Sequence, residues 1–389
     1  MLVWKIIFWI SCFIIFYNYL GYALLIFMIN KLKGRGKKNK EEFFPTVSFI
    51  VAAYNEEDCI EKKILNSFDQ DYPPEKIEFL FITDGSTDRT NEIISRYPQV
   101  KLLYEQQRRG KSAALNRVVS HALNDILIFS DANTILNREA TRFIARHYLH
   151  PSVGGVAGEK KVIPATEKTD QVGAGEGLYW KYESFLKQLD SDFYSVVGAA
   201  GELFSLRKEL YEAVDDSVIL DDFVISMKVA AKGYRVIYEP EAFAMELPSF
   251  SMKDEQKRKI RIAAGGFQAM TILAPLISFW KQPALGFLYF SHRVLRWTLS
   301  PLGFILAFVS NAIIFFGTGE LIYKILFIGQ LVFYAMALVA AFFTLKTGIF
   351  KLFRLAYYFV FMNLSVVQGF LRFLRGKQPA AWEKAKRSQ

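Results

Sequence analysis

The chain has 389 residues, of which 52% are apolar and 16% aromatic, and its formal net charge is +10. This length allows more than one domain, and the apolar content is higher than in most soluble proteins, which indicates membrane segments. The two cysteines, Cys12 and Cys59, exclude a disulfide framework, and the four histidines show no zinc-ligand spacing. Because much of the positive charge lies beside hydrophobic runs, we expect the lipid bilayer as a partner and no nucleic acid.

A hydrophobic run from Trp4 to Ile29 is long enough to cross a bilayer. No small-residue cleavage site follows it, so we predict an N-terminal transmembrane anchor over residues 1–31 and not a removed signal peptide. The next segment, KLKGRGKKNK, is strongly basic. Positive charge marks the cytoplasmic side, so we expect the N-terminus outside and the middle of the chain in the cytoplasm.

Short apolar runs alternate with helical patterns between Pro45 and about Leu247. The runs TVSFIVAA, IEFLFIT, VKLLY and DILIFS are typical of buried parallel strands. The segments DCIEKKILNSF, DRTNEIISRY and KSAALNRVVSHAL between them predict helices. This alternation predicts a doubly wound α/β domain over residues 45–250, whose ligands bind at the carboxyl ends of the strands.

The remainder of the chain is hydrophobic and basic. Residues 251–298 mix apolar runs with Lys, Arg and Trp, which predicts amphipathic interface helices. Residues 299–375 contain three hydrophobic runs, at about 299–316, 321–345 and 355–372, and predict a C-terminal transmembrane region before a basic tail at 376–389. The third run has basic residues on both sides, so either it lies in the interface or the tail is outside.

Polar residues follow the first three predicted strands. In VAAYNEED, Asn55 could cap a helix and Glu56 would favour the helix dipole. In TDGSTDRT, turn and capping residues leave Asp84 at the strand end, where a carboxylate can accept hydrogen bonds from a base or ribose. RRGKSAALN lacks the earlier glycine of a Walker A motif, because Glu105 occupies that position, but Lys111 at a helix start could still meet a phosphate.

Acidic residues mark two further places. Asp131 ends the fourth strand and Asn133 follows two residues later, which suits Mg²⁺ or Mn²⁺, although an Asx turn is the alternative. Asp221 and Asp222 open a predicted helix, either as capping residues or as a general base whose pKa its neighbour raises.

Two arginines follow in the basic stretch after the α/β domain. Arg258 and Arg261 share a helical face, where they could meet anionic lipid or clamp a leaving diphosphate.

Taken in this order from about Thr46 to Gln268, these motifs resemble those of membrane-integrated family 2 glycosyltransferases. That group includes chitooligosaccharide, poly-N-acetylglucosamine and hyaluronan synthases. The resemblance implies an α/β fold with a GT-A-type doubly wound mixed sheet, joined to α-helical transmembrane and interface helices. It also implies inverting transfer of a hexosyl or N-acetylhexosaminyl group from a UDP-sugar, with Mg²⁺ or Mn²⁺ as cofactor.

The resemblance further implies roles for individual residues. Ala53, Tyr54 and Glu56 would flank the base, while Asp84 would hold the uracil or ribose. Lys111 would lie near the pyrophosphate, and Asp131 with Asn133 would bind the metal. The acceptor site would be lined by Gly198, Ala199, Ala200 and Gly201. Asp222 would be the catalytic base, preceded by Asp221. Arg258 and Arg261 would match the QxxRW motif of processive enzymes and belong to the donor site.

The sequence departs from that pattern in two places. The QxxRW motif reads RKIRI, with Arg258 in place of Gln and Ile262 in place of Trp, and Asn133 replaces the second carboxylate of the usual DxD. We therefore keep two kinds of acceptor open: a growing polysaccharide or oligosaccharide of the cell envelope, and a lipid that receives a single sugar. A polysaccharide transporter with a degenerate transferase domain is a further alternative.

The expected location is the plasma (inner) membrane, with several membrane passes and the catalytic domain in the cytoplasm. A second copy of the chain or an export partner could complete a path for the product.

Overall fold

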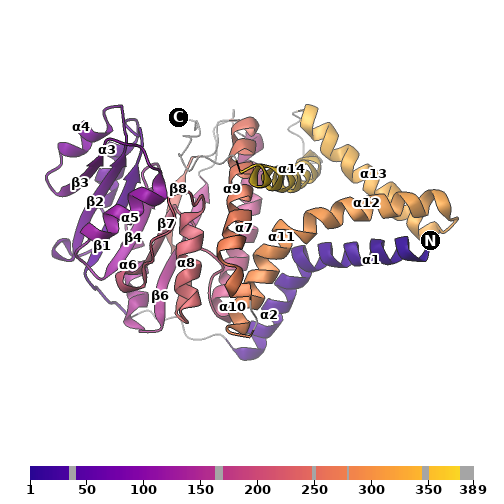
Figure 1. Cartoon of the computed structure of the whole chain (residues 1–389), viewed down its shortest axis with the longest axis horizontal. Helices are drawn as coiled ribbons and strands as arrows, with labels where there is room; N and C mark the ends of the chain where they lie inside the picture. Colours follow the sequence, from indigo (N-terminus) through magenta and orange to yellow (C-terminus); the bar gives the residue numbers. More distant parts are fainter. Residues whose placement is uncertain (35–40, 163–169, 248–250, 278–279, 344–349, 377–389) are drawn as a thin grey trace.

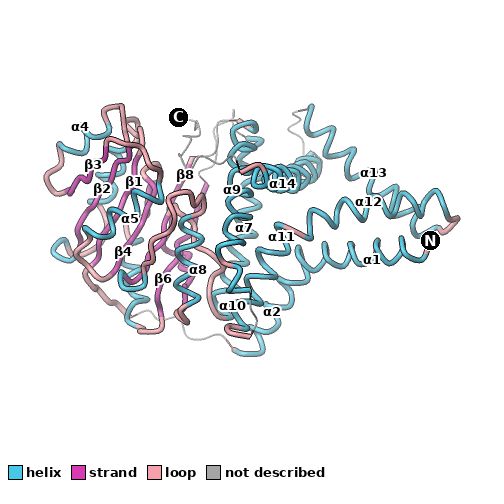
Figure 2. The backbone as a smooth tube through the Cα atoms, in the orientation of Figure 1, coloured by secondary structure: helices cyan, strands magenta, loops and turns pink. Residues whose placement is uncertain are grey.

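The computed structural model describes residues 1–34, 41–162, 170–247, 251–277, 280–343 and 350–376. Within these residues an α/β domain lies at one end of the molecule, and long helices extend away from it (Figures 1 and 2). The strands alternate with helices as far as the second half of the domain, which is the pattern that the sequence predicts.

One sheet of eight strands forms the centre of the α/β domain, in the order β3-β2-β1-β4-β7-β6-β8-β5. The strands are β1 (Val47–Ala53), β2 (Ile77–Asp84), β3 (Val100–Glu105), β4 (Ile126–Asp131), β5 (Ile135–Leu136), β6 (Val153–Val162), β7 (Leu203–Arg207) and β8 (Arg235–Glu246). The first four are parallel, β7 runs antiparallel to β4 and β6, β8 is parallel to β6, and β5 is antiparallel to β8. The predicted mixed, doubly wound sheet is confirmed.

Helices cover both faces of this sheet because its strands carry apolar side chains on both faces. The helices of the domain are α3 (Ile60–Phe68), α4 (Thr90–Ser95), α5 (Lys111–His121), α6 (Ala140–Ala145), α7 (Asp170–Phe193) and α8 (Asp221–Ala231), with short 3₁₀ turns at Pro74–Lys76, Arg146–Leu149 and Lys208–Leu210. One core cluster joins the sheet to α3, α4 and α6, and a second joins it to α5, α7 and α8.

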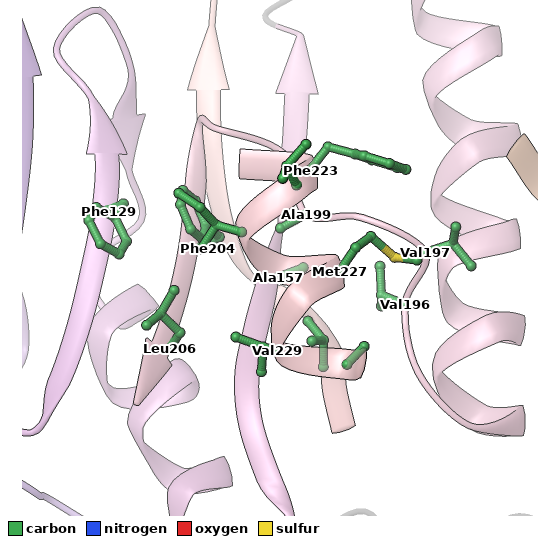
Figure 3. Packing of buried hydrophobic residues seen from close by; sticks show 14 of the residues in the cluster. Phe129, Ala157, Val196, Val197, Ala199, Phe204, Leu206, Phe223, Met227 and Val229 are labelled. Atoms are coloured by element: carbon green, nitrogen blue, oxygen red, sulfur yellow. The ribbon is translucent and has the colours of Figure 1, made fainter. Parts of the chain in front are cut away.

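Aromatic packing links the parallel and antiparallel halves of the sheet. Phe129 of β4 and Phe204 of β7 are both buried, and their rings stack with centroids 4.7 Å apart. Figure 3 shows this pair beside the residues of α8 that pack on the same face, including Phe223 and Met227. Ring stacking of this kind adds to the free energy gained by burying the apolar surface, so the antiparallel strands are fixed against the strand that carries Asp131.

The register of the parallel strands aligns their carboxyl ends. Ala52 of β1 pairs with Asp131 of β4, and Ala53 pairs with Thr83 of β2. Asp84 is the next residue of β2 and pairs with Glu105 of β3. Because these ends lie at one edge of the sheet, the loops that follow them meet there.

Helix α7 was not predicted from the sequence, and neither were the strands β6, β7 and β8. Leu186 and Leu189 of α7 are buried in the same core as α5 and α8, while Phe185 is 46% exposed. The buried face of α7 is not a continuous apolar stripe, because it includes polar residues such as Glu183 and Asp190, which are buried in ion pairs and hydrogen bonds. The helix therefore lacks the apolar periodicity by which a sequence reveals a buried face.

The long helices outside the α/β domain fall close to the predicted runs. They are α1 (Leu2–Phe16), a π-helical turn (Tyr17–Gly21), α2 (Tyr22–Lys33), α12 (Leu299–Gly317), α13 (Leu321–Phe342) and α14 (Phe350–Leu374). Four of the described segments are long and apolar enough to cross a membrane: Leu2–Lys33, α12, α13 and α14.

Between the α/β domain and these spans lies a junction of further helices. Its elements are α9 (Met252–Ile272), a 3₁₀ turn (Ala274–Ile277), α10 (Pro283–Tyr289), a π-helical turn (Phe290–Val294) and α11 (Leu295–Trp297). Figure 1 shows α9 running beside α7, across the end of α1 and α12.

The first membrane helix shares its core with the α/β domain. Tyr22 and Ile26 of α2 are fully buried in the cluster that contains Leu189 of α7. The Tyr22 hydroxyl donates to Asp190 Oδ1 at 2.5 Å, and His292 Nδ1 lies 2.5 Å from the other oxygen of Asp190. These buried contacts fix the position of α2 relative to α7, because separating the helices would leave the Asp190 carboxylate buried with fewer partners. The N-terminal helix pair and the α/β domain are therefore packed as one body.

Candidate active site

Asp84 organises the loop between β3 and α5. Its Oδ2 accepts hydrogen bonds from the backbone N–H groups of Arg109 at 3.0 Å and Gly110 at 2.6 Å. Its Oδ1 accepts from Arg117 Nη2 at 3.0 Å. The carboxylate is 5% exposed. Both oxygens are thus engaged in holding the start of α5, so Asp84 positions Lys111, and direct contact of Asp84 with a nucleoside stays a prediction.

The interpretation of Asn55 as a helix cap is wrong. Helix α3 begins at Ile60, five residues later, and Asn55 adopts a left-handed backbone with φ 53°. Its side-chain oxygen accepts from the N–H of Thr87 at 2.8 Å, and its own N–H donates to Ser86 Oγ at 3.1 Å. Asn tolerates this conformation because its short side chain bonds locally. Asn55 therefore ties the loop after β1 to the loop after β2.

Three other predicted donor-site residues surround this pair of loops. Ala53 is buried at the end of β1, and Glu56 is 6% exposed, with its N–H donating to Thr90 Oγ1 at 2.8 Å. The ring of Tyr54 lies under the guanidinium of Arg108, whose central carbon is 3.7 Å from the ring centroid. An arginine stacked on a tyrosine offers a flat, cationic surface.

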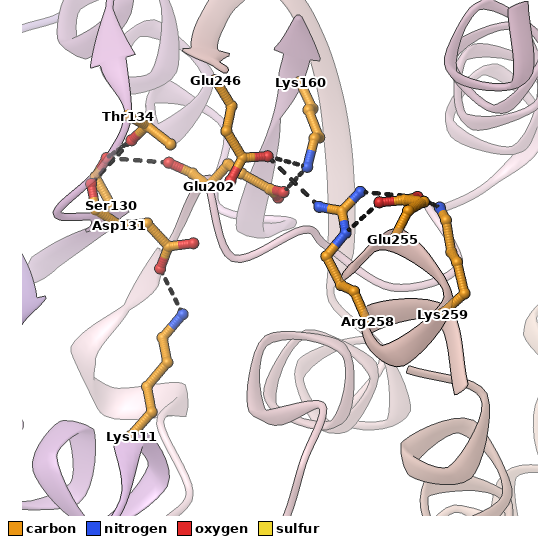
Figure 4. Close-up of polar contacts among 10 residues, drawn as sticks. All are labelled: Lys111, Ser130, Asp131, Thr134, Lys160, Glu202, Glu246, Glu255, Arg258 and Lys259. Carbon is orange, nitrogen blue, oxygen red and sulfur yellow. Dashed lines mark hydrogen bonds and ion pairs between the residues drawn. The ribbon is translucent and has the colours of Figure 1, made fainter. Parts of the chain in front are cut away.

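Asp131 and Lys111 meet at the edge of the sheet. Lys111 Nζ donates to Asp131 Oδ1 at 2.6 Å (Figure 4). The turn after Asp131 is closed through its backbone, because the carbonyl of Asp131 accepts from Thr134 Oγ1 at 2.9 Å. The side chain of Asp131 therefore faces Lys111 and does not make the turn, which argues against the Asx-turn alternative.

Lys63 supports the turn that follows Asp131, and this role was not predicted from the sequence. Its ammonium group is fully buried and donates to Ser130 Oγ at 2.6 Å and to the carbonyl of Thr134 at 3.1 Å. Burial lowers the pKa of Lys63 to about 7, although the charge of Asp131 partly opposes this. A signal was present, because Lys63 lies on the helical face of Ile60, Ile64 and Ser67, which is otherwise uncharged.

The predicted acceptor loop packs against the start of α8. Gly198 has φ 84° and lies so close to the Phe223 ring that a Cβ would fall 2.0 Å from it. The N–H of Ala199 donates to Ser226 Oγ at 2.8 Å, and Ser226 donates to the carbonyl of Asp222 at 2.7 Å. The loop therefore has one defined position relative to Asp222.

Gly201 is the point at which the loop, Lys111 and Asp222 converge. A Cβ on Gly201 would lie 3.0 Å from Lys111 Nζ and 3.1 Å from Asp222 Oδ2. The structure thus brings together Asp131, Lys111 and Asp222, which are far apart in sequence. Asp221 lies beside them as the first residue of α8 and is 4% exposed.

The charges at this point alter one another. Burial raises the pKa of Asp222 to about 7, and the neighbouring charge of Asp221 adds to the increase, while Lys111 opposes it. Burial also raises the pKa of Asp131. Burial lowers the pKa of Lys111, but the three surrounding carboxylates more than offset this and raise it above its usual value. Lys111 therefore stays charged, and Asp222 can exchange a proton near neutral pH.

Arg258 belongs to a chain of buried ion pairs that ends beside Gly201. Arg258 pairs with Glu255 at 3.1 Å and with Glu246 at 3.7 Å, and Lys160 bridges Glu246 to Glu202 (Figure 4). Burial raises the pKa of Glu202, but Lys160 and Arg258 lower it below its ordinary range. Among the described contacts, Arg258 is thus held by carboxylates. Its role as a diphosphate clamp, and that of Arg261 one turn further along α9, stay predictions.

Glu202 and Lys160 were also missed. Glu202 directly follows the loop that was identified, and Lys160 lies in the strand sequence GEKKV, where it is 2% exposed. Trp297 was missed as well. Its ring centroid lies 5.6 Å from that of Phe223, and its ring lies 3.0 Å from where a Cβ on Gly266 would be. Trp297 lies in the junction helices, so sequence distance hid its connection to the loop.

No group of three or more His, Cys, Asp or Glu side chains suited to a metal occurs among the described residues. The candidate metal site therefore rests on Asp131 and Asn133 alone. Mg²⁺ and Mn²⁺ are commonly held by one or two protein oxygens together with substrate phosphates. The partly buried carboxylate of Asp131, already paired with a cation, fits that arrangement, and Asn133 can supply an amide oxygen from the same turn.

Comparisons with known proteins agree with this geometry. Residues 48–215 match the family model described as glycosyl transferase family 2. The chain is 28% identical to the poly-beta-1,6-N-acetyl-D-glucosamine synthase of Staphylococcus aureus (strain MSSA476) over 231 residues, 58% of this chain and 55% of that protein. The synthase of the same name from Staphylococcus epidermidis is 24% identical over 63% of this chain and 59% of that protein. The chain thus matches little more than half the length of these relatives.

A solved structure shows the same fold over almost the whole chain. It is a mannosyltransferase from Pyrobaculum calidifontis in complex with GDP-Man and Mn²⁺, and it has a TM-score of 0.74 at 22% sequence identity. The match covers 96% of this chain and 100% of that chain. The predicted GT-A-type fold is confirmed.

The convergence at Gly201 generates a prediction. In Gly201→Ala, the new methyl group would displace Lys111 Nζ and Asp222 Oδ2, which lie at the flexible ends of their side chains. We expect a fold of nearly unchanged thermal stability but a loss of activity of about 10²-fold, because displacement of reacting groups by about 1 Å is that costly. The measurement is initial rate together with melting temperature.

Gly329→Ala is the matched control, since nothing lies within 4 Å of a Cβ at that position. Equal activity in the two variants would contradict the placement of Lys111 and Asp222 in the reacting centre.

Proposed function

Because residues 48–215 form a glycosyltransferase family 2 domain, we propose that this chain transfers a sugar from a UDP-sugar to a growing saccharide of the cell envelope, with inversion at the anomeric carbon. The observation that supports this most strongly is the meeting of Lys111, Asp131 and Asp222 at the carboxyl end of the sheet. One cation and a carboxylate of raised pKa lie where a doubly wound domain binds its ligand.

The nucleotide would lie over the first three strand ends. The stacked pair of Tyr54 and Arg108 offers a surface for the base, and the loops after β1 and β2 are fixed to each other through Asn55. Asp84 holds the loop that leads into α5, so that Lys111 faces the diphosphate. An ammonium group at this place stabilises negative charge that grows on a departing diphosphate.

A divalent cation would be held by Asp131 and Asn133. Such a cation, when bound, supplies positive charge next to the two phosphates of the donor. The mannosyltransferase of the same fold is a complex with Mn²⁺ and GDP-Man, which supports a metal and a nucleotide sugar for this fold.

The chemical step is a single displacement. The acceptor hydroxyl gives its proton to Asp222, its oxygen forms a bond to the anomeric carbon, and the bond from that carbon to the diphosphate oxygen breaks. The electron pair of the broken bond stays on the diphosphate. Asp222 is suited to this because its raised pKa, to about 7, makes it a better base than an ordinary carboxylate while about half of it is ionised at neutral pH.

The acceptor would approach over Gly198–Gly201. A saccharide acceptor is supported by the similarity to poly-N-acetylglucosamine synthases. A lipid that receives one sugar is a second candidate, and a specific observation favours it. Ile262 stands where processive relatives carry a stacking Trp, and it is 37% exposed on α9, the helix that packs against the apolar α14.

The proposed location is the plasma membrane with the α/β domain in the cytoplasm. Lys31 and Lys33 close α2 at the end nearest this domain, which agrees with the positive-inside rule. Nucleotide sugars would reach the site from the same side.

Replacing the proposed base gives a direct test. In Asp222→Asn we expect transfer to fall by about 10²–10⁴-fold, because that is the usual contribution of general base catalysis. Binding of UDP, measured by calorimetry, should persist because Asp222 contacts neither Asp84 nor the Tyr54 surface. Asp69→Asn, whose side chain is 69% exposed, is the control. Transfer at a near wild-type rate in Asp222→Asn would show that Asp222 is not the general base.

The raised pKa of Asp222 predicts a pH dependence. The base must be deprotonated to act, so kcat/KM for the acceptor should rise with pH and reach half its maximum near the pKa of about 7. Activity should be lost as the pH falls below that value, because Asp222 is then protonated. UDP affinity should not follow the same curve. A profile that stays flat from about pH 5.5 to 8.5 would contradict a base of this kind.

The donor and acceptor are tested together by incubating membranes that contain the full chain with radiolabelled UDP-sugars and with GDP-mannose. We expect label to move from one of the UDP-sugars. A ladder or long polymer would indicate a saccharide acceptor, and a single organic-soluble product would indicate the lipid. Transfer from GDP-mannose alone would overturn the uridine donor while leaving the fold and site in place.

A further inference from the structure

Helix α14 has a different orientation from the other membrane helices. Figures 1 and 2 show α1, α12 and α13 along their length, whereas α14 is seen end-on beside α9. Helices α7 and α9, which belong to the α/β side of the molecule, also run across the direction of α1 and α12 (Figure 1). A helix that lies across the spanning direction lies in the plane of the bilayer.

The spanning direction can be fixed from the far end of the molecule. Met1 lies at Gly317, where a Cβ would fall 3.2 Å from the Met1 sulfur, and Lys5 forms an ion pair with Glu320. The start of α1 and the α12–α13 connection thus lie together, and Figure 1 places them farthest from the sheet. Lys31 and Lys33 lie at the opposite end of the first span. The first span, α12 and α13 therefore make three crossings between these two ends.

Helix α14 is attached to the α/β side of this arrangement. Gly369 allows the closest approach, since a Cβ there would lie 2.5 Å from the Ala263 side chain and 2.9 Å from the N–H of Ala264 on α9. Phe370 packs on Phe267 of α9 with ring centroids 4.9 Å apart. α9 is in turn tied to the sheet, because Arg258 pairs with Glu246 of β8. These contacts join the end of α14 to the catalytic side, while Phe359 in its middle packs on Phe304 of α12 and Phe333 of α13.

The outer surface of α14 combines apolar and basic side chains. Its exposed leucines include Leu352 at 58%, Leu364 at 55% and Leu374 at 62%. Basic residues lie at both ends of the helix, Lys351 and Arg354 at the start and Arg372 and Arg375 at the end. If α14 crossed the bilayer, one basic pair would face the outside, against the positive-inside rule. If α14 lies in the membrane interface, the basic residues at both of its ends reach the head groups of the same leaflet.

A hollow beside the end of α14 has the same mixed character. Its volume is about 370 Å³, and it is lined by Ile260 of α9 and by Gln368, Leu371, Arg372 and Arg375 of α14. Two guanidinium groups next to apolar side chains suit an anionic lipid, whose phosphate meets the arginines while its chains meet the leucine.

We propose that α14 lies in the plane of the bilayer, in the leaflet that faces the α/β domain, and binds anionic lipid there. The chain then crosses the membrane three times, and both ends of α14 are on the catalytic side. This removes the conflict between hydrophobicity and charge at residues 355–372. The proposal does not depend on sugar transfer, so it can stand or fall separately from the proposed function.

Cysteine accessibility tests the topology in the full chain. Starting from Cys12→Ser/Cys59→Ser, single cysteines replace Gly319, Lys351 or Arg375, and intact cells are treated with a membrane-impermeant maleimide. We expect labelling at position 319 in intact cells, and at 351 and 375 only after the cells are permeabilised. Labelling of 351 or 375 in intact cells would overturn the proposal. So would labelling of either only after denaturation, because the residue would then lie inside the bilayer.

Lipid dependence tests the proposed partner. Purified full-length chain in detergent is mixed with phosphatidylglycerol or phosphatidylcholine, and melting temperature is measured. We expect greater stabilisation by phosphatidylglycerol, and loss of that difference in Arg372→Gln/Arg375→Gln. The control Arg96→Gln/Arg138→Gln removes two exposed charges of the α/β domain and should keep the difference. Equal stabilisation of the wild-type chain by both lipids would contradict a site for anionic lipid.

Discussion

A partly buried cation, Lys111, determines the geometry of the candidate site. Lys111 lies between Asp131 and Asp222, and without it these carboxylates would share a buried edge of the sheet with no opposite charge between them. Like charges in such a place raise one another's pKa and favour the protonated forms. Lys111 stays charged because the carboxylates surround it, and they remain close together because it is there. The elements that place Lys111 follow from this constraint. Asp84 holds the start of α5, and Gly201 leaves room for the ammonium group.

The site around Lys111 is connected by side-chain packing to the helices that could cross a membrane. Phe223 follows Asp222 and contacts Trp297, which lies in the junction just before α12. Tyr22 of the first span shares a buried carboxylate, Asp190, with His292 of that junction. The long apolar helices that could cross a membrane therefore also support the site. Helix α14 lies one helix, α9, away from the ion pairs that end at Glu202.

Much of the fold could be read from the sequence, because buried parallel strands are continuous apolar runs and polar residues follow their ends. That rule found Asp84, Asp131 and Lys111, and the helix that begins with Asp221 and Asp222. It could not find Lys63 or Glu202, because a buried charge looks like a surface charge until its partners are known. Asn55 was misread for a related reason, since its partners come from the neighbouring loop and not from the next helix. α7 was missed because its buried acids interrupt the apolar stripe. The match of residues 48–215 to glycosyl transferase family 2 leaves the roles of the site residues as proposals.

The central claim is that Asp131, paired with Lys111, is the place where metal and donor diphosphate meet. Titration of Mn²⁺ into the purified full chain, followed by electron paramagnetic resonance with and without UDP, tests it most directly. We expect UDP to strengthen Mn²⁺ binding in the wild-type chain and Asp131→Asn to weaken that binding by about 10–100-fold or more. Equal Mn²⁺ affinity in the two proteins in the presence of UDP would contradict it.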